Sequence, residues 1–216
     1  MKKHLLAEFI GTFIIVFVGT GAMVLDEVAS GSLTHLGFCI VWGIAVAGAI
    51  ISAGKIHESH YNPAVTLALV FAGKFSREKS LEHIGAQIAG AVTASIILHF
   101  VFPLNHTLGA TLPTVSAWGA AGIEVVISFL LMAAIAFTEI VGSKWKNFPA
   151  IVIGIAVMLL AYFAGPLTGA SMNPARSIGP AIISGHTENL WLYLIAPVVG
   201  MILAVPLYRF VKPPTN

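Results

Sequence analysis

Hydrophobic residues along this chain fall into long runs that are separated by short polar connectors. A helix needs about 20 mostly apolar residues to cross the roughly 30 Å of hydrocarbon in a bilayer. Six runs have that length: 5–25, 33–53, 81–102, 118–139, 148–164 and 189–210. The first run follows two lysines, but no small-residue cleavage site clearly follows it, so we expect a retained span rather than a signal peptide. The pattern predicts an all-α membrane protein with six spanning helices.

Two further apolar stretches, Pro63 to Ala72 and Pro174 to Ser184, reach only about half of that length. Each follows an asparagine, and Asn-Pro is typical of a helix cap followed by the first helical residue. A stretch that is too short to span alone and begins at a cap predicts a half-helix entered from a loop.

The composition agrees with a membrane protein, because 57% of the residues are hydrophobic and only 9% are charged, against about 25% charged in soluble domains. Cys39 is the single cysteine, so neither a disulfide within the chain nor a thiol metal cluster is expected. The net charge of +2 comes from basic residues in connectors, not from one basic face, which argues against nucleic-acid binding.

The basic residues also predict the orientation, because lysine and arginine favour cytoplasmic loops. Ten of the eleven fall on one side of the predicted spans: Lys2, Lys3, Lys55, Lys74, Arg77, Lys79, Lys144, Lys146, Arg209 and Lys212. Both termini are therefore expected in the cytoplasm, with the protein in the plasma or cell inner membrane. Arg176 is the exception, and a charge inside an apolar half-helix needs an explanation.

The chain also repeats itself. Glu8 and Glu124 open comparable helices, and each is followed by an Asn-Pro-Ala triplet at a similar distance. Because three spans separate the halves, we expect a single channel domain over 1–216 with inverted repeats of approximately 5–102 and 118–210. Broken helices in inverted repeats place a substrate path near the midplane. Gln87 and Gly90 are expected to serve close helix packing.

The two triplets predict a pore that passes water and rejects ions. Half-helices entering from opposite sides would aim their partly positive N-termini at each other, together with the amides of Asn62 and Asn173. Two donors on one water oxygen would interrupt a proton wire. A plain helix cap is the alternative for one triplet, whereas two at inverted positions favour the pore.

These features resemble the aquaporins, the major intrinsic protein family, over nearly the whole chain. The matching segments are Ala-Glu-Phe-Ile-Gly-Thr (7–12), His-Tyr-Asn-Pro-Ala-Val-Thr (60–66), Ala-Gln-Ile-Ala-Gly-Ala (86–91) and Thr-Gly-Ala-Ser-Met-Asn-Pro-Ala-Arg-Ser (168–177). The resemblance implies six helices plus two half-helices, a homotetramer with one pore per subunit, and no cofactor. It assigns the pore motifs to Asn62, Pro63, Ala64, Asn173, Pro174 and Ala175.

The resemblance also assigns roles to four polar residues. Arg176 matches the arginine of the outer constriction, although a snorkelling arginine is the alternative. Glu8 and Glu124 match glutamates that hold the loop backbones so that carbonyls line the pore. A neutral buried glutamate with a local hydrogen bond remains open for each. His60 matches a pore-lining histidine.

Counting back from the triplets gives the other filter positions as Trp42, Ala161 and Ala170. Water-selective members resemble one another in a Phe and His pair there, whereas this set leaves a wider, amphipathic opening in which a polyol could lie against Trp42. Trp42 could instead be a packing or lipid-facing aromatic, and a slip of one residue would put Tyr162 at the site.

The branch of the family follows from two further positions. Ser177 is aquaporin-like, since glycerol facilitators usually carry Asp there, and Tyr193-Leu194 looks like the nodulin-intrinsic-protein branch and its bacterial relatives. The implied solutes are water, glycerol and neutral acids such as boric or arsenious acid.

The chain departs from the family at His57-Glu58-Ser59, where small residues that let carbonyls turn into the pore are usual. One hypothesis is that His57 and Glu58 form a titratable collar at the cytoplasmic mouth; a solvated loop pair is the alternative. The other histidines show no ligand spacing, so no metal site is expected.

The preferred interpretation is a passive channel, not an enzyme, for water and small uncharged solutes. A strictly water-selective channel is the first alternative. A coupled secondary transporter is the second, because inverted repeats occur there too, although transporters place ionisable groups at the midplane where this chain has amides. A purely structural junction protein would leave Arg176 unexplained.

Overall fold

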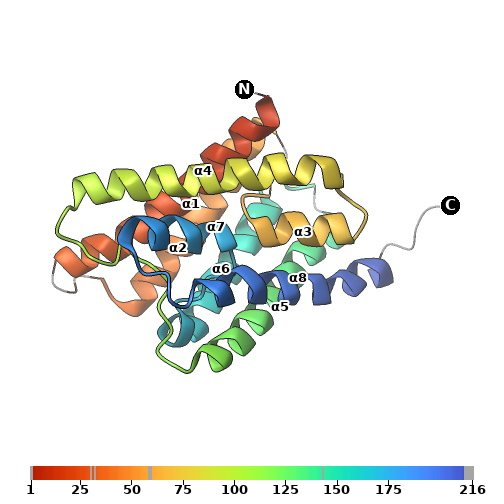
Figure 1. Cartoon of the computed structure of the whole chain (residues 1–216). Coiled ribbons are helices and arrows are strands. Elements are labelled where there is room, and N and C mark those ends of the chain that lie inside the picture. The colour runs from red at the N-terminus through yellow and green to blue at the C-terminus, as the bar shows by residue number, and fades with distance from the viewer. Residues whose placement is uncertain (1, 30, 32, 58–59, 143, 212–216) are drawn as a thin grey trace.

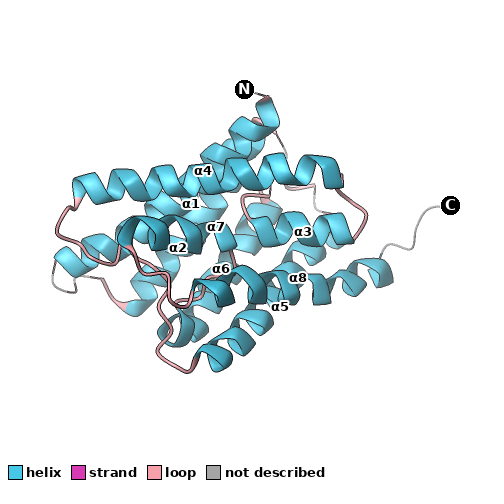
Figure 2. Cartoon of the chain, viewed as in Figure 1, coloured by secondary structure: helices cyan, strands magenta, loops and turns pink. Residues whose placement is uncertain are grey.

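A computed structural model of the chain describes residues 2–29, 31, 33–57, 60–142 and 144–211, and within these residues it contains helices and loops but no strand (Figure 2). In this part of the chain, six helices are long and apolar enough to cross a membrane. They are α1 (Lys3–Val28), α2 (His35–Ser52), α4 (Arg77–Val101), α5 (Ala117–Val141), α6 (Phe148–Thr168) and α8 (Leu190–Val211). The predicted all-α fold with six spans is confirmed.

The two half-helices are also confirmed. A 3₁₀ turn, η1 (Ala53–Lys55), follows α2, and the chain then enters α3 (Pro63–Phe71); α7 (Pro174–Ser184) is its counterpart in the second half. Both begin at the proline after an asparagine cap. Because the missing N–H of proline costs nothing in the first turn of a helix, Asn-Pro fixes where each half-helix starts.

One helix is longer than its sequence indicates. The apolar run at 148–164 predicts an end before Pro166, but α6 continues through that proline to Thr168. A proline inside a membrane helix is tolerated where neighbouring groups take up the freed carbonyls. Here Pro166 lacks the N–H that the carbonyl of Tyr162 would receive, and this carbonyl oxygen instead accepts a hydrogen bond from His35 Nε2 of α2 at 2.7 Å.

The two halves pack in the same way and exchange their half-helices. In the first half α1 packs against α2 and α4, and in the second half α5 packs against α6 and α8. Each half-helix also contacts the other half, α3 against α8 and α7 against α4. Figure 1 shows α3 towards one end of the long helices and α7 towards the other. The starts of the two half-helices therefore meet inside the bundle.

Glycines permit the closest of these helix contacts. A Cβ on Gly90 of α4 would lie 2.4 Å from the carbonyl oxygen of Phe9 in α1, and one on Gly200 of α8 would lie 2.2 Å from that of Val125 in α5. These distances are shorter than any side chain allows, so the backbones touch directly. The prediction that Gly90 serves close helix packing is confirmed.

The bundle has two ends. We call the end at which α1 and α4 begin, and α5 ends, the N-terminal face; Lys2 of α1's cap and Glu82 of α4 form an ion pair there. The other end, where α1 finishes and the loop 102–116 joins α4 to α5, is called the loop face.

Candidate functional site: the pore

The two Asn-Pro-Ala triplets cap the half-helices that meet in the centre. The side-chain oxygen of Asn62 accepts a hydrogen bond from the backbone N–H of Ala64 at 2.8 Å. In the same way, the oxygen of Asn173 accepts from the N–H of Ala175 at 3.0 Å. Each cap satisfies N–H groups that a helix start leaves without a partner, and it fixes the direction of the amide.

The amide nitrogens tie the two halves together. Asn62 Nδ2 donates to the carbonyl oxygen of Met172 at 2.8 Å, and Asn173 Nδ2 donates to the carbonyl oxygen of Tyr61 at 3.0 Å. Each asparagine thus bonds to the residue that precedes the other asparagine. An amide NH₂ group carries two N–H bonds, so each side chain still has one donor for a solute.

Glu8 holds the loop before the first triplet. Its two carboxylate oxygens accept from the backbone N–H groups of His60 and Tyr61, both at 2.7 Å. Gln87 Nε2 of α4 donates to one of the same oxygens at 2.8 Å. Gln87 is expected to serve helix packing, and its amide also orients this carboxylate.

Glu124 makes the matching contacts in the second half. Its oxygens accept from the backbone N–H groups of Ser171 at 2.8 Å and Met172 at 2.9 Å, and the hydroxyl of Thr168 donates to it at 2.8 Å. Glu8 and Glu124 are both fully buried. Buried carboxylates are tolerated only with such donors around them, so both glutamates act as fixed anchors for the loop backbones.

The anchored loops contain residues in the left-handed backbone region. Tyr61 has φ 55°, Ala170 has φ 43° and Met172 has φ 52°. Side chains other than glycine rarely adopt this conformation, and surrounding contacts have to enforce it. The carbonyls that receive the asparagine amides belong to Tyr61 and Met172, so a turned backbone persists here without glycine. Glu58 and Ser59, by contrast, lie outside the described residues.

A cavity of about 320 Å³ runs through this junction. It is lined by Asn62 and Asn173 at the junction, by His60 on one side of it, and by the four predicted filter residues Trp42, Ala161, Ala170 and Arg176 on the other. The prolines and alanines of the triplets do not line the cavity, since they form the buried first turns of α3 and α7.

Arg176 is held in place from several sides. Its side chain is only 2% exposed, and Nη1 donates to the carbonyl oxygen of Gly109 at 2.8 Å. Nη2 lies 3.6 Å from the sulfur of Met23, and Cζ lies 4.6 Å from the centre of the Trp42 ring, within the range of a cation–π contact. A snorkelling arginine would reach towards lipid headgroups, whereas this side chain is enclosed by protein and borders the cavity.

Trp42 and two alanines complete the ring. The indole of Trp42 faces Arg176, while Ala161 and Ala170 contribute only methyl groups. Tyr162, the residue that a slip of one position would bring in, is instead exposed, and its ring packs beside the ring of His35. The opening is therefore framed by one aromatic face, one guanidinium and two small side chains.

The cavity ends at the N-terminal face beside an ion pair that the sequence did not predict. Thr138 and Glu139 at the end of α5 and Pro149 at the start of α6 line this end. Lys74, in the connector after α3, forms an ion pair with Glu139. A lysine in a connector and a glutamate near a helix end resemble ordinary surface charges, so only the fold shows that they flank the pore.

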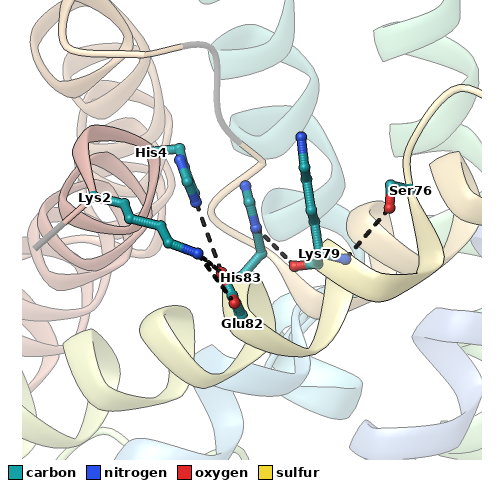
Figure 3. Close-up of polar contacts among 6 residues, drawn as sticks. All are labelled: Lys2, His4, Ser76, Lys79, Glu82 and His83. Carbon is teal, nitrogen blue, oxygen red and sulfur yellow. Dashed lines mark hydrogen bonds and ion pairs between the residues drawn. The ribbon is translucent and has the colours of Figure 1, made fainter.

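Histidines gather near the same face. The rings of His4 and His83 stack with centres 5.1 Å apart, His57 meets His4 edge-on at 5.7 Å, and His60 lies 5.9 Å from His83. Figure 3 shows His4 and His83 above the pair formed by Lys2 and Glu82. Histidines of α1 and α4 thus lie near His57, while Glu58, the other residue of the hypothesised collar, lies outside the described residues. Among the described residues, no group of three or more His, Cys, Asp or Glu is arranged to hold a metal ion.

Among the described residues, six helices long and apolar enough to cross a membrane, two half-helices and a cavity through their junction define the class of protein: a multi-pass membrane channel. The family model "Major intrinsic protein" matches residues 1–208. The chain therefore belongs to the major intrinsic protein family, and it is a channel and not an enzyme.

Relatives of known name cover nearly the whole chain. Aquaporin NIP1-2 of Oryza sativa subsp. japonica is 37% identical over 98% of this chain and 73% of its own length. Nodulin-26 of Glycine max is 36% identical over 97% of this chain and 78% of its own length. The similarity predicted to the nodulin-intrinsic-protein branch is thus confirmed.

A solved structure has the same fold. The X-ray structure of the aquaglyceroporin from Plasmodium falciparum superposes with a TM-score of 0.89 and covers 98% of this chain and 97% of its own, at 24% sequence identity. At that identity the likeness concerns the fold.

Proposed function

We propose that this protein is a passive channel for water and small uncharged solutes such as glycerol. The observation that carries the proposal is the frame of the opening, in which Ala161 and Ala170 leave space opposite the ring of Trp42 and the guanidinium of Arg176. The apolar face of a polyol can lie on the indole while its hydroxyls accept from the arginine. The names of the relatives, aquaporin and aquaglyceroporin, agree with such solutes.

The same frame suits boric and arsenious acid. Both are neutral near physiological pH and carry several hydroxyl groups on a compact centre, so they can use the donors of Arg176, Asn62 and Asn173 in turn. A strictly water-selective channel is the alternative, and it would require the opening to be narrower than its alanines suggest.

Ions and protons are excluded at two places in this proposal. A cation meets Arg176 in the filter, and at the junction it meets the N-termini of α3 and α7, which carry partial positive charge. The two asparagine amides each offer a donor, so a passing water presents its oxygen to both and cannot relay a proton. The inverted repeat supports this arrangement, because both halves make the same glutamate and asparagine contacts.

We further propose that the N-terminal face is cytoplasmic, that the membrane is the plasma or cell inner membrane, and that four chains assemble with one pore in each. The excess of basic residues on one side supports the orientation. A C-terminal reporter that functions only outside the cytoplasm should stay silent, and a signal from it would overturn the orientation. Native mass spectrometry from mild detergent should show tetramers, and only monomers would contradict the assembly.

The test is stopped-flow light scattering on liposomes that contain the purified protein. We expect fast shrinkage in an impermeant osmolyte and rapid re-swelling in glycerol, and both rates should be unchanged when ionophores collapse the ion gradients. Re-swelling no faster than in empty liposomes would leave the water-selective alternative. Dependence of the glycerol flux on an ion gradient would indicate a coupled transporter instead.

A further inference from the structure

The loop 102–116 supplies the acceptor that holds the filter arginine. It crosses the loop face between α4 and α5, and the carbonyl oxygen of its Gly109 accepts from Arg176 Nη1 at 2.8 Å. Gly109 packs tightly on α1, where an added Cβ would lie 2.9 Å from Thr20. The position of one peptide in this loop therefore decides where the guanidinium rests.

That peptide lies in an unfavourable backbone turn. Leu108 and Gly109 are consecutive residues with φ of 50° and 67°, and Leu108 is fully buried. Glycine adopts this region readily, but leucine does not, so neighbouring contacts must hold the turn in place. The relevant contacts are made by Asn105 and Thr107.

Side chains of Asn105 and Thr107 bind the turn from within the loop. Asn105 Oδ1 accepts from the backbone N–H of Leu108 at 2.7 Å. The hydroxyl of Thr107 accepts from the N–H of Gly109 at 3.3 Å, and the carbonyl oxygen of Thr107 accepts from the N–H of Ala110 at 2.9 Å. Both side chains must keep one orientation for the turn to persist.

Glu27, near the end of α1, fixes both orientations. One carboxylate oxygen accepts from Asn105 Nδ2 at 2.6 Å and the other from the hydroxyl of Thr107 at 3.0 Å. The Asn105 amide must then present its oxygen to Leu108, and the Thr107 hydroxyl must present its lone pairs to Gly109. Bonds to a carboxylate are stronger than those between neutral groups, so a single acid can hold the whole turn.

We propose that Glu27 is a positioning residue for the selectivity filter. Through Asn105 and Thr107 it fixes the Gly109 carbonyl, and this carbonyl keeps the guanidinium of Arg176 against Trp42 and out of the opening. The role rests on the proposed function, because it concerns the width of the pore for neutral solutes. Without Glu27, the guanidinium loses its fixed acceptor and moves towards the solute path, which hinders glycerol more than the smaller water molecule.

The experiment compares Glu27→Ala with Asp26→Ala, a matched control on the same turn of α1. Asp26 has the same charge, but its carboxylate accepts from the N–H of Leu33 in the α1–α2 connector. The measured quantity is the ratio of glycerol to water permeability in liposomes. This ratio does not depend on how many channels are incorporated, and both solutes are neutral, so a change in surface charge does not alter it.

We expect the ratio to fall about three- to tenfold in Glu27→Ala, as for the loss of one ordinary hydrogen bond, and to stay at the wild-type value in Asp26→Ala. Glu27→Gln keeps one acceptor oxygen and should recover part of the ratio. Thr107→Val should lower the ratio too. The double variant Glu27→Ala/Thr107→Val should have a ratio no lower than that of Glu27→Ala alone, because both residues act through one turn. An unchanged ratio in Glu27→Ala, or effects that simply add, would overturn the proposal.

A second measurement reads the loop itself. Hydrogen exchange in detergent should become faster across 102–116 in Glu27→Ala but not in Asp26→Ala. If liposomes with the wild-type protein are permeable to water but not to glycerol, the proposed solute range is wrong. The exchange rates and the water permeability per incorporated chain still test the role of Glu27 in that case. Unaltered exchange in the loop would overturn that role on its own.

Discussion

The indole of Trp42 has two close neighbours at the predicted filter. The guanidinium of Arg176 lies over its ring, and Gly19 of α1 lies so near that an added Cβ would be 2.4 Å from the ring. No side chain tolerates such a distance, so the Trp42 ring can take this position only because residue 19 is a glycine. At the scale of single residues, the position of Trp42 thus depends on a glycine that does not line the cavity.

Gly19→Ala should therefore narrow the pore. The new methyl group has to displace the Trp42 ring towards the opening, at an overpacking cost of about 1–3 kcal/mol. We expect glycerol permeability to fall more than water permeability. Gly48→Ala is the control, because position 48 lies on the same helix as Trp42 and faces open space. Equal glycerol-to-water ratios in both variants would show that Trp42 is not held in this way.

Individual residues also show where sequence reasoning stops. Trp42, Ala161, Ala170 and Arg176 could be named together because the resemblance to the family fixes their distances from the triplets, and the structure places all four along one cavity. Glu27 and Asn105 are 78 residues apart, and an irregular loop offers no period from which their contact could be predicted. Similarly, Gln87 in a helix reads as packing until the fold brings Glu8 to its amide.

At the scale of elements, local sequence signals and contacts with distant residues together fix the half-helices. The length of each apolar stretch and its Asn-Pro start were sufficient to predict α3 and α7, because neither signal depends on distant residues. Their orientation towards each other depends on tertiary contacts, because buried glutamates of α1 and α5 accept hydrogen bonds from the loop N–H groups. The extension of α6 through Pro166 is tertiary as well, since His35 of α2 binds the carbonyl of Tyr162 that this proline frees.

Glu124→Gln should weaken the second half-helix loop. The hydroxyl of Thr168 and the N–H groups of Ser171 and Met172 donate to the two carboxylate oxygens of Glu124. A glutamine has only one acceptor oxygen, and its NH₂ group would face a backbone N–H. Leaving a buried donor without a partner costs about 1–3 kcal/mol, so we expect a lower thermal midpoint in detergent together with slower water flux. Glu188→Gln, at an exposed site before α8, should leave both unchanged. A midpoint equal to that of wild type would show that Glu124 does not anchor the loop.

At the scale of the whole molecule, two similar halves enclose one path. Each half contributes a pair of long helices in direct backbone contact, a buried glutamate and a capped half-helix. The halves differ at the ends of the path, where the loop face carries Arg176 under the 102–116 loop and the N-terminal face carries the pair of Lys74 and Glu139. The centre is therefore nearly symmetric, while the two ends of the path carry different side chains.

The central claim is that the space left by the filter alanines admits solutes larger than water, and Ala161→His tests it most directly. An imidazole at that position would occupy the opening opposite Trp42 and add a donor. Glycerol permeability should fall about tenfold or more, while water still passes. A tenfold fall corresponds to a rise of only about 1.4 kcal/mol in the barrier to permeation. Glycerol flux that is unchanged in this variant, with normal water flux, would contradict the assignment of the filter.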